Sequence, residues 1–284
     1  MTQIFLRLTQ MKKRSLTGFI YIISIIGIII PCKVYAFDIT AGATAWYAWG
    51  SRFENTYDYS IRKNNNYAFD PTFLYGPVLS AKLNNDFNLT FVYLYSKFNY
   101  TEEVYKDYGG DYFVKSKIKR SDSDFALNYR LNNYFKAFAG VKYLGYEIKL
   151  SYDDITTKTH SSQSKHDSFG PGLGLSFTCP IAENIFLLAT LSGFYLFSAG
   201  EKFEDNLLYD KSNPAKMTVG YNEYGINTNI SAAYYIASIS TVISLGFRFQ
   251  YFITDYYDYE PFLIDKIKNQ FYGVTLTATY TLNL

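Results

Sequence analysis

The sequence predicts one all-β domain, a closed antiparallel transmembrane β-barrel of about ten strands. The first observation is the alternation of apolar and small polar residues, which is clearest from Phe169 to Phe177. Successive side chains of a strand point to opposite faces, so this alternation gives one apolar face and one polar face. The second is the aromatic content, with 30 Tyr and 24 Phe, which suits rings at two membrane interfaces. The third is an N-terminal export signal.

The N-terminal segment, residues 1–36, has the features of a secretory signal peptide. It carries five basic residues and no acidic one, an apolar run from Leu16 to Ile30, and a small-residue cleavage site that ends at Ala36. Met11 begins a shorter version of the same signal. A retained inner-membrane anchor is the alternative interpretation. We therefore expect a signal peptide at 1–36, an outer-membrane β-barrel at 37–284, and export to the bacterial cell outer membrane.

Cleavage after Ala36 changes the charge of the chain. Removing five basic residues from a net charge of +2 leaves −3, so no basic excess suggests a nucleic-acid partner. Cys179 remains as a lone cysteine, which we interpret as a small apolar group near a strand end. We find no Cys/His metal spacing, phosphate-binding glycine loop or nucleotide motif, and we predict no cofactor.

Ten segments have the alternation of a strand, and the connections between them fall into two classes. Short Asn-rich turns such as Asn84-Asn85-Asp86 and Asn132-Asn133 alternate with long polar loops near 51–72, 97–117, 150–167, 199–223 and 254–270. This asymmetry is typical of the periplasmic and extracellular ends of a membrane barrel, and an even strand count leaves both termini on the turn side. An eight-stranded barrel is the alternative. The predicted strands are Phe37–Trp49, Phe73–Leu83, Phe87–Ser96, Ile118–Leu131, Tyr134–Lys149, Ser168–Cys179, Ile185–Ser198, Tyr224–Tyr235, Ile239–Ile253 and Phe271–Leu284.

Four strands that follow a long loop begin with an aromatic residue, a glycine and an apolar residue, as at Tyr75-Gly76-Pro77 and Phe169-Gly170-Pro171. We interpret the ring as part of the outer girdle and the glycine as an inward position where the wall bends. Pro77 and Pro171 each remove a backbone donor from the ladder. Either a bulge lies at these prolines or the two strands begin later than predicted.

The last predicted strand has apolar residues at even positions from Tyr272 to Leu284 and Thr or Asn at odd positions from Thr275 to Asn283. With this strand the chain resembles the outer-membrane β-barrel proteins of Gram-negative-type bacteria, in particular small porin-like members. The resemblance implies outer-membrane lipid as the surroundings and recognition of the C-terminal strand by the barrel-assembly machinery. Many of these proteins end in Phe, whereas this chain ends in Leu284. An extracellular ligand, if there is one, has no signature that identifies it.

Strand alternation also places charged side chains in the lumen. Keeping both faces consistent across the Asn132-Asn133 turn places Lys142 opposite Asp122 or Asp124. Charges in a narrow lumen are expected to pair, because an unpaired buried charge is costly. The charged residues predicted to face inward are Lys82, Asp122, Asp124, Arg130, Lys136, Lys142 and Arg248.

These charges leave several functions open. The barrel is either a narrow channel for small solutes or a structurally closed barrel, and the alternative is an adhesin-like protein that binds through its loops. A third candidate is an omptin-like outer-membrane protease, a family that uses an acid pair and an Asp–His couple. Asp122 and Asp124 have the spacing of the acid pair. However, His160 and His166 both fall in the predicted loop 150–167, and the Asp-x-His spacing is absent. We therefore predict no enzyme and assign no catalytic residue.

Overall fold

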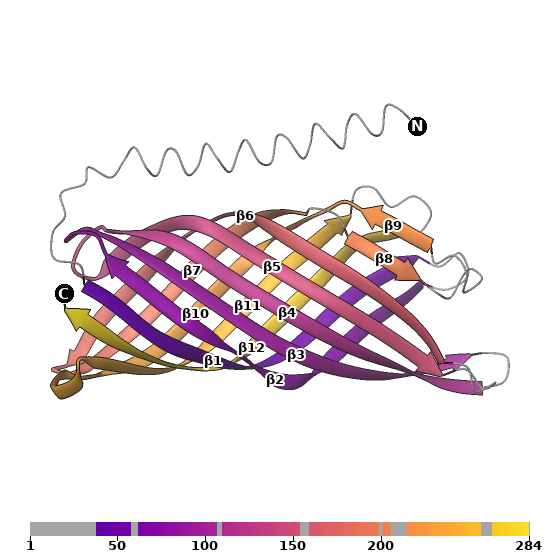
Figure 1. Cartoon of the computed structure of the whole chain (residues 1–284), viewed down its shortest axis with the longest axis horizontal. Helices are drawn as coiled ribbons and strands as arrows, with labels where there is room; N and C mark the ends of the chain where they lie inside the picture. The colour runs from indigo at the N-terminus through magenta and orange to yellow at the C-terminus, as the bar shows by residue number, and fades with distance from the viewer. Residues whose placement is uncertain are drawn as a thin grey trace, which may run out of the picture. The chain divides into compact units, whose positions relative to one another are not determined.

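A computed structural model of the chain contains a closed, all-antiparallel β-barrel (Figure 1). Ten strands form the wall, which confirms the predicted number and shows that the eight-stranded alternative is wrong. The predicted signal segment and Leu284 lie outside the described part of the chain. The structure describes residues 38–57, 62–106, 110–153, 159–198, 201–205, 215–256 and 263–283.

The strands are longer than a membrane requires, and their alternating residues form the two faces of the wall. Within the described ranges the sole helix is the 3₁₀ turn Ala237–Ile239. No helix in these ranges is long and apolar enough to cross a membrane. The strands are β1 (Asp38–Tyr57), β2 (Arg62–Lys82), β3 (Phe87–Lys106), β4 (Gly110–Arg130), β5 (Phe135–Asp153), β6 (Thr159–Ala182), β7 (Ile185–Ser198), β8 (Glu201–Asp205), β9 (Ala215–Val219), β10 (Tyr221–Ile236), β11 (Thr241–Tyr256) and β12 (Leu263–Asn283).

The first and last strands pair with each other, and every other pair in the wall joins wall strands that follow one another in the sequence. β1 pairs with β12, so that Asp38 lies opposite Asn283, and β5 pairs with β6 to complete the ring. β8 and β9 form a hairpin that extends β6 on the loop side and do not belong to the wall. Both described ends therefore lie on the short-turn side of the barrel, as the even strand count predicts.

The two ends of the barrel differ. On the turn side, the side chains of Asn84 and Asn132 each accept two backbone N–H hydrogen bonds, at 2.8–2.9 Å, and so stabilise the turns. On the opposite side, most of the residues predicted as long loops are strand, and this prediction was wrong. The outward apolar residues stop before the strands end, but the hydrogen-bond ladder continues beyond them. The connections at 58–61, 107–109, 154–158 and 257–262 lie outside the described residues.

An apolar band surrounds the outside of the barrel. On β12 every outward residue from Tyr272 to Leu282 is apolar, a run that matches the roughly 9–11 residues with which a tilted strand crosses a bilayer. Beyond Tyr272 the outward residues are Gln270 and Lys268. Exposed apolar side chains of the band include Phe73, Tyr75, Leu79, Phe125, Tyr129, Leu173, Leu175, Leu191, Tyr195, Phe197, Ile226, Ile230, Leu245, Phe247, Tyr272, Val274, Leu276 and Tyr280.

The prolines of the two aromatic–Gly–Pro segments follow neither predicted alternative. β2 and β3 keep one register on either side of Pro77, and β6 and β7 keep one register on either side of Pro171. Both strands begin earlier than predicted. The wall tolerates each missing donor as a local gap in one ladder. A register shift does occur at Pro180, between that residue and Ala182.

Glycines let neighbouring strands approach closely inside the barrel. A Cβ on Gly140 would lie 1.9 Å from the carbonyl oxygen of Phe125 in β4, whereas one on Gly172, its partner in β6, would meet nothing closer than 3.6 Å. We expect Gly140→Ala to lower the free energy of unfolding by about 1–3 kcal/mol, because the strands must separate. Gly172→Ala is the matched control, with an expected change within about 0.5 kcal/mol.

Urea unfolding of both variants in detergent, followed by Trp fluorescence, measures this difference. Equal stability of the two variants would show that the close approach of β5 to β4 carries no constraint.

Candidate functional site

The inward face of the barrel changes in character along the axis. Near the turns it carries hydroxyl side chains, with Thr40 bonded to Thr281 at 3.1 Å and Thr44 bonded to Thr277 at 2.7 Å. Toward the loop end follow a cluster of charges, a layer of aromatic rings, and an open pocket. The register of the strands sets this order, because it fixes which residues lie next to each other across the ladder and directly paired residues face the same side.

The cluster of charges, here called the central cluster, consists of Arg120, Asp122, Asp124, Lys142, Arg248 and Gln250. Lys142 lies between two carboxylates: its Nζ donates to Oδ1 of Asp122 and, at 3.0 Å, to Oδ1 of Asp124. The other carboxylate oxygen of Asp122 lies 3.1 Å from Nη2 of Arg120 and 3.6 Å from Nη2 of Arg248. Asp122 therefore joins three cations at the centre of the barrel.

Most of the central cluster is shielded from solvent, and Asp124 is its most exposed member, at 38%. The side chains of Arg120, Asp122 and Lys142 are 0, 1 and 4% exposed. Arg120 also donates to Oε1 of Gln250, which is fully buried. Paired charges of this kind are stable away from water only when partners surround them.

Aromatic rings cover the cations of the central cluster. The guanidinium of Arg120 lies 4.0 Å from the ring centre of Phe271, and that of Arg248 lies 4.6 Å from the ring centre of Trp46. Both rings are buried, Trp46 completely. Cation–π contacts stabilise desolvated guanidinium groups, so these rings replace part of the lost hydration.

Four phenylalanines next to the cluster form an aromatic layer across the lumen: Phe69, Phe98, Phe252 and Phe271. The rings of Phe252 and Phe271 are stacked, with centres 6.2 Å apart and planes 9° apart. Phe69 stacks on Phe271 at 6.0 Å, and Phe98 contacts both. The aromatic content therefore has two locations. The sequence indicated only the outer girdles, whereas the largest buried rings lie inside the barrel.

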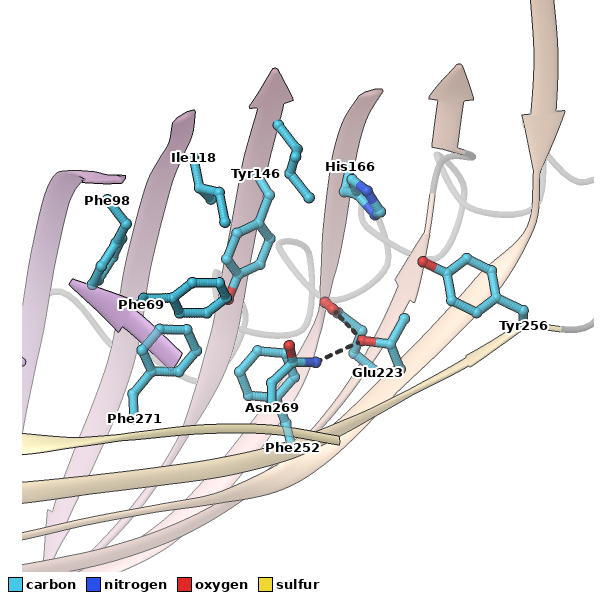
Figure 2. Close-up of a pocket in the computed structure, with 12 residues that line it drawn as sticks. Phe69, Phe98, Ile118, Tyr146, His166, Glu223, Phe252, Tyr256, Asn269 and Phe271 are labelled. Atoms are coloured by element: carbon cyan, nitrogen blue, oxygen red, sulfur yellow. Dashed lines mark hydrogen bonds between the residues drawn. The ribbon is translucent and has the colours of Figure 1, made fainter. Parts of the chain in front are cut away.

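On the loop side of the aromatic layer lies a pocket, here called the cup. Its floor is the aromatic layer, and its polar wall carries His166, Glu223, Thr254 and Asn269 (Figure 2). Glu223 is 3% exposed. Its carboxylate accepts hydrogen bonds from the hydroxyls of Ser168 and, at 3.1 Å, Thr254.

Of the predicted lumen charges, the structure brings together Asp122, Asp124, Lys142 and Arg248. Lys142 lies opposite Asp124, which is one of the two predicted registers. The other three, Lys82, Arg130 and Lys136, lie at the turn end and are exposed. Lys82 pairs with Asp38 at 3.2 Å, and Arg130 bonds to the Asn132-Asn133 turn.

Sequence reasoning missed two important charged residues. Arg120 lies two positions before Asp122 in a predicted strand and therefore on the same face. Its inward direction could have been found from the alternation. Glu223 fell in a predicted loop but belongs to β10, two positions before the inward Gly225.

The predicted location of the histidines was also wrong. His160 and His166 lie in strand β6, and the side chain of His166 is buried and faces the cup. The proposed acid pair, Asp122 and Asp124, is bonded to Lys142 in the central cluster. Within the described ranges no group of His, Cys, Asp and Glu could hold a metal ion.

Comparison with known proteins shows similarity of fold. No family model matches the chain, and no curated protein matches it. The outer-membrane protease OmpT from Escherichia coli superposes with a TM-score of 0.62 at 14% identity, over 88% of this chain and 99% of OmpT. Ail of Yersinia pestis, an attachment invasion locus protein, gives a TM-score of 0.35 at 12% identity, over 86% of this chain and 99% of Ail. OprG, an outer-membrane protein of Pseudomonas aeruginosa, gives 0.36 at 10% identity, over 87% and 96%.

Proposed function

We propose that the chain is an outer-membrane β-barrel that is closed to solute flow and binds a ligand from outside through the cup. The observation that carries this proposal is the buried central cluster. A conducting pore needs a continuous hydrated path, whereas at this level Arg120, Asp122 and Lys142 are at most 4% exposed and rings cover both guanidinium groups. The cup lies on the loop side of this level.

The surroundings of the barrel support a bilayer location. The apolar band has the height of a hydrocarbon core, and the outward residues above it are charged. In the ladders of β3, β4 and β5, Lys97 lies opposite Lys119 and Lys117 lies opposite Lys149. Like charges directly opposite each other destabilise a sheet, so these pairs favour an anionic surface, such as headgroup phosphates, next to the band.

Glu147 contributes the described acid nearest to these lysines, at 2.9 Å from Lys119 and 3.4 Å from Lys149. One carboxylate leaves the group positively charged. We therefore propose that this positively charged group meets anionic headgroups at the outer surface. The loop end is then the outer end, and the short turns lie in the periplasm. We further propose that residues 1–36 direct export and are removed.

Cysteine labelling on intact cells tests both closure and orientation. Asn269 and Thr277 both face the lumen from β12, Asn269 in the wall of the cup and Thr277 on the turn side of Trp46. In a Cys179→Ala background, we expect Asn269→Cys to react with a membrane-impermeant maleimide. Thr277→Cys should react only after the outer membrane is permeabilised, because the central cluster lies between them.

Each alternative has its own labelling pattern. Reaction of Thr277→Cys on intact cells, together with Asn269→Cys, would indicate an open channel. Reaction of Thr277→Cys alone on intact cells would indicate that the barrel has the opposite orientation, with the short turns outside. Asn85→Cys, in the first short turn, is an exposed control and should show the same labelling pattern as Thr277→Cys.

A further inference from the structure

The cup combines an aromatic floor with a buried carboxylate in its wall. The floor is the layer of Phe69, Phe98, Phe252 and Phe271, whose ring centres lie 5.7–6.2 Å from their neighbours. The carboxylate is that of Glu223, which lies beside Phe252 and Asn269 in Figure 2. A ligand in the cup would lie next to the aromatic layer and next to the carboxylate.

The hydrogen bonds of Glu223 come from neutral donors. Oε2 accepts from the hydroxyl of Ser168 and Oε1 accepts from that of Thr254, which in turn accepts from Asn269 Nδ2 at 3.2 Å. Within the described ranges no Lys or Arg nitrogen lies within 4.0 Å of this carboxylate. A carboxylate oxygen can accept more than one hydrogen bond, so both oxygens keep capacity for a donor that enters the cup.

We propose that the cup binds an organic ammonium ion with an aromatic or apolar body. The ammonium group would donate to Glu223, and the body would lie on the aromatic floor. Both elements favour a cation, because a buried carboxylate pairs with it and ring faces attract it. This inference rests on the proposed function and names its ligand class.

A charge series on one aromatic body tests the proposal. The probes are 2-phenylethylammonium, 2-phenylethanol and phenylacetate, titrated calorimetrically into the barrel in lipid nanodiscs at about pH 8, where the free alkylammonium and the free carboxylate are both charged. Empty nanodiscs give the background from partitioning into lipid. We expect the ammonium to bind about tenfold more tightly than the alcohol, as a charge-assisted hydrogen bond predicts, and phenylacetate to bind most weakly.

Glu223→Gln keeps the shape of the side chain and an acceptor oxygen for one of the two hydroxyls, while its amide N–H can donate to the other. It should reduce the affinity for the ammonium about tenfold, to that for the alcohol, while Asp38→Asn, at the turn end, should leave the series unchanged. Folding of each variant is checked by heat-dependent gel mobility. If Glu223→Gln does not fold, the charge series on the wild type decides alone.

Equal affinities for the three probes, a preference for phenylacetate, or no binding above the empty nanodiscs would overturn the proposal. These outcomes are separate from failure of the proposed function. An open lumen would appear as labelling of Thr277→Cys on intact cells, whatever the preference of the cup.

Discussion

Replacing Asp122 with alanine is expected to lower the free energy of unfolding by about 3–5 kcal/mol. Asp122 is the anion that Arg120, Lys142 and Arg248 share, and its side chain is 1% exposed. Its removal leaves three buried cations with the single, partly exposed carboxylate of Asp124. A buried charge without a partner is costly, so this loss of stability should be much larger than the loss caused by breaking a surface ion pair.

Asp38→Ala is the matched control, because it also breaks a carboxylate–lysine pair. The Asp38–Lys82 pair is exposed, at 31 and 49%, so we expect a loss below about 1 kcal/mol. Urea unfolding of both variants in the same detergent gives the comparison. A loss for Asp122→Ala as small as that for Asp38→Ala would mean that water reaches the central cluster and that the lumen is open at this level.

The double variant Trp46→Ala plus Phe271→Ala is expected to turn a silent barrel into a conducting one. These two rings are 0 and 2% exposed and cover Arg248 and Arg120. Their removal leaves a charge-lined gap that water can fill. The same loss of packing should lower the stability by about 3–5 kcal/mol for each ring.

The control for this variant uses the outward neighbours on the same two strands. Trp49 and Tyr272 stack with ring centres 6.0 Å apart on the outside of the barrel and are 37 and 39% exposed. Trp49→Ala plus Tyr272→Ala removes similar rings and should stay silent in a planar bilayer. Conductance in both double variants would indicate damage to the wall. Silence in both would mean that the closure lies elsewhere.

The sequence was sufficient to predict the barrel, its strand number and its turn side, because lipid imposes alternation on every membrane-spanning segment. β7 was predicted with its bounds, Ile185–Ser198. The loop-side ends of the strands were not predictable from that signal. Above the band, outward residues such as Lys97, Lys119 and Lys165 face water, and the pattern then looks like that of a polar loop although the ladder continues.

The candidate site was predictable where the odd or even position of a residue in its strand (its parity) is enough to decide which way the side chain points. Alternation and turn geometry together place Lys142 opposite Asp122 or Asp124, and the structure has Asp124. Parity cannot tell whether an aromatic residue belongs to a girdle or to the lumen when a strand is apolar on both faces. In β7, Phe194 and Leu196 face the lumen while Tyr195 and Phe197 face outward, and only the register with β6 and β10 resolves this.

Which charges meet depends on their height in the barrel as well as their face. Arg130 and Lys136 share the inward parity of Asp124 and Lys142 but lie at the turn end, opposite each other. The predicted strands already place Arg130 and Lys136 beside the Asn132-Asn133 turn, and the prediction grouped them with the central charges by face alone. The cup was missed for a different reason, since His166 and Glu223 both lay in predicted loops.

Single-channel conductance of the refolded wild-type chain, residues 37–284, in a planar bilayer measures directly whether the lumen is closed. Heat-dependent gel mobility first establishes that the barrel has folded, and the Trp46→Ala plus Phe271→Ala variant serves as the conducting reference. We expect no conductance from the wild type, because the central cluster and the aromatic layer close the lumen. Steady wild-type conductance, with an ion preference that changes in Lys142→Ala, would contradict it and identify an open, charge-lined channel.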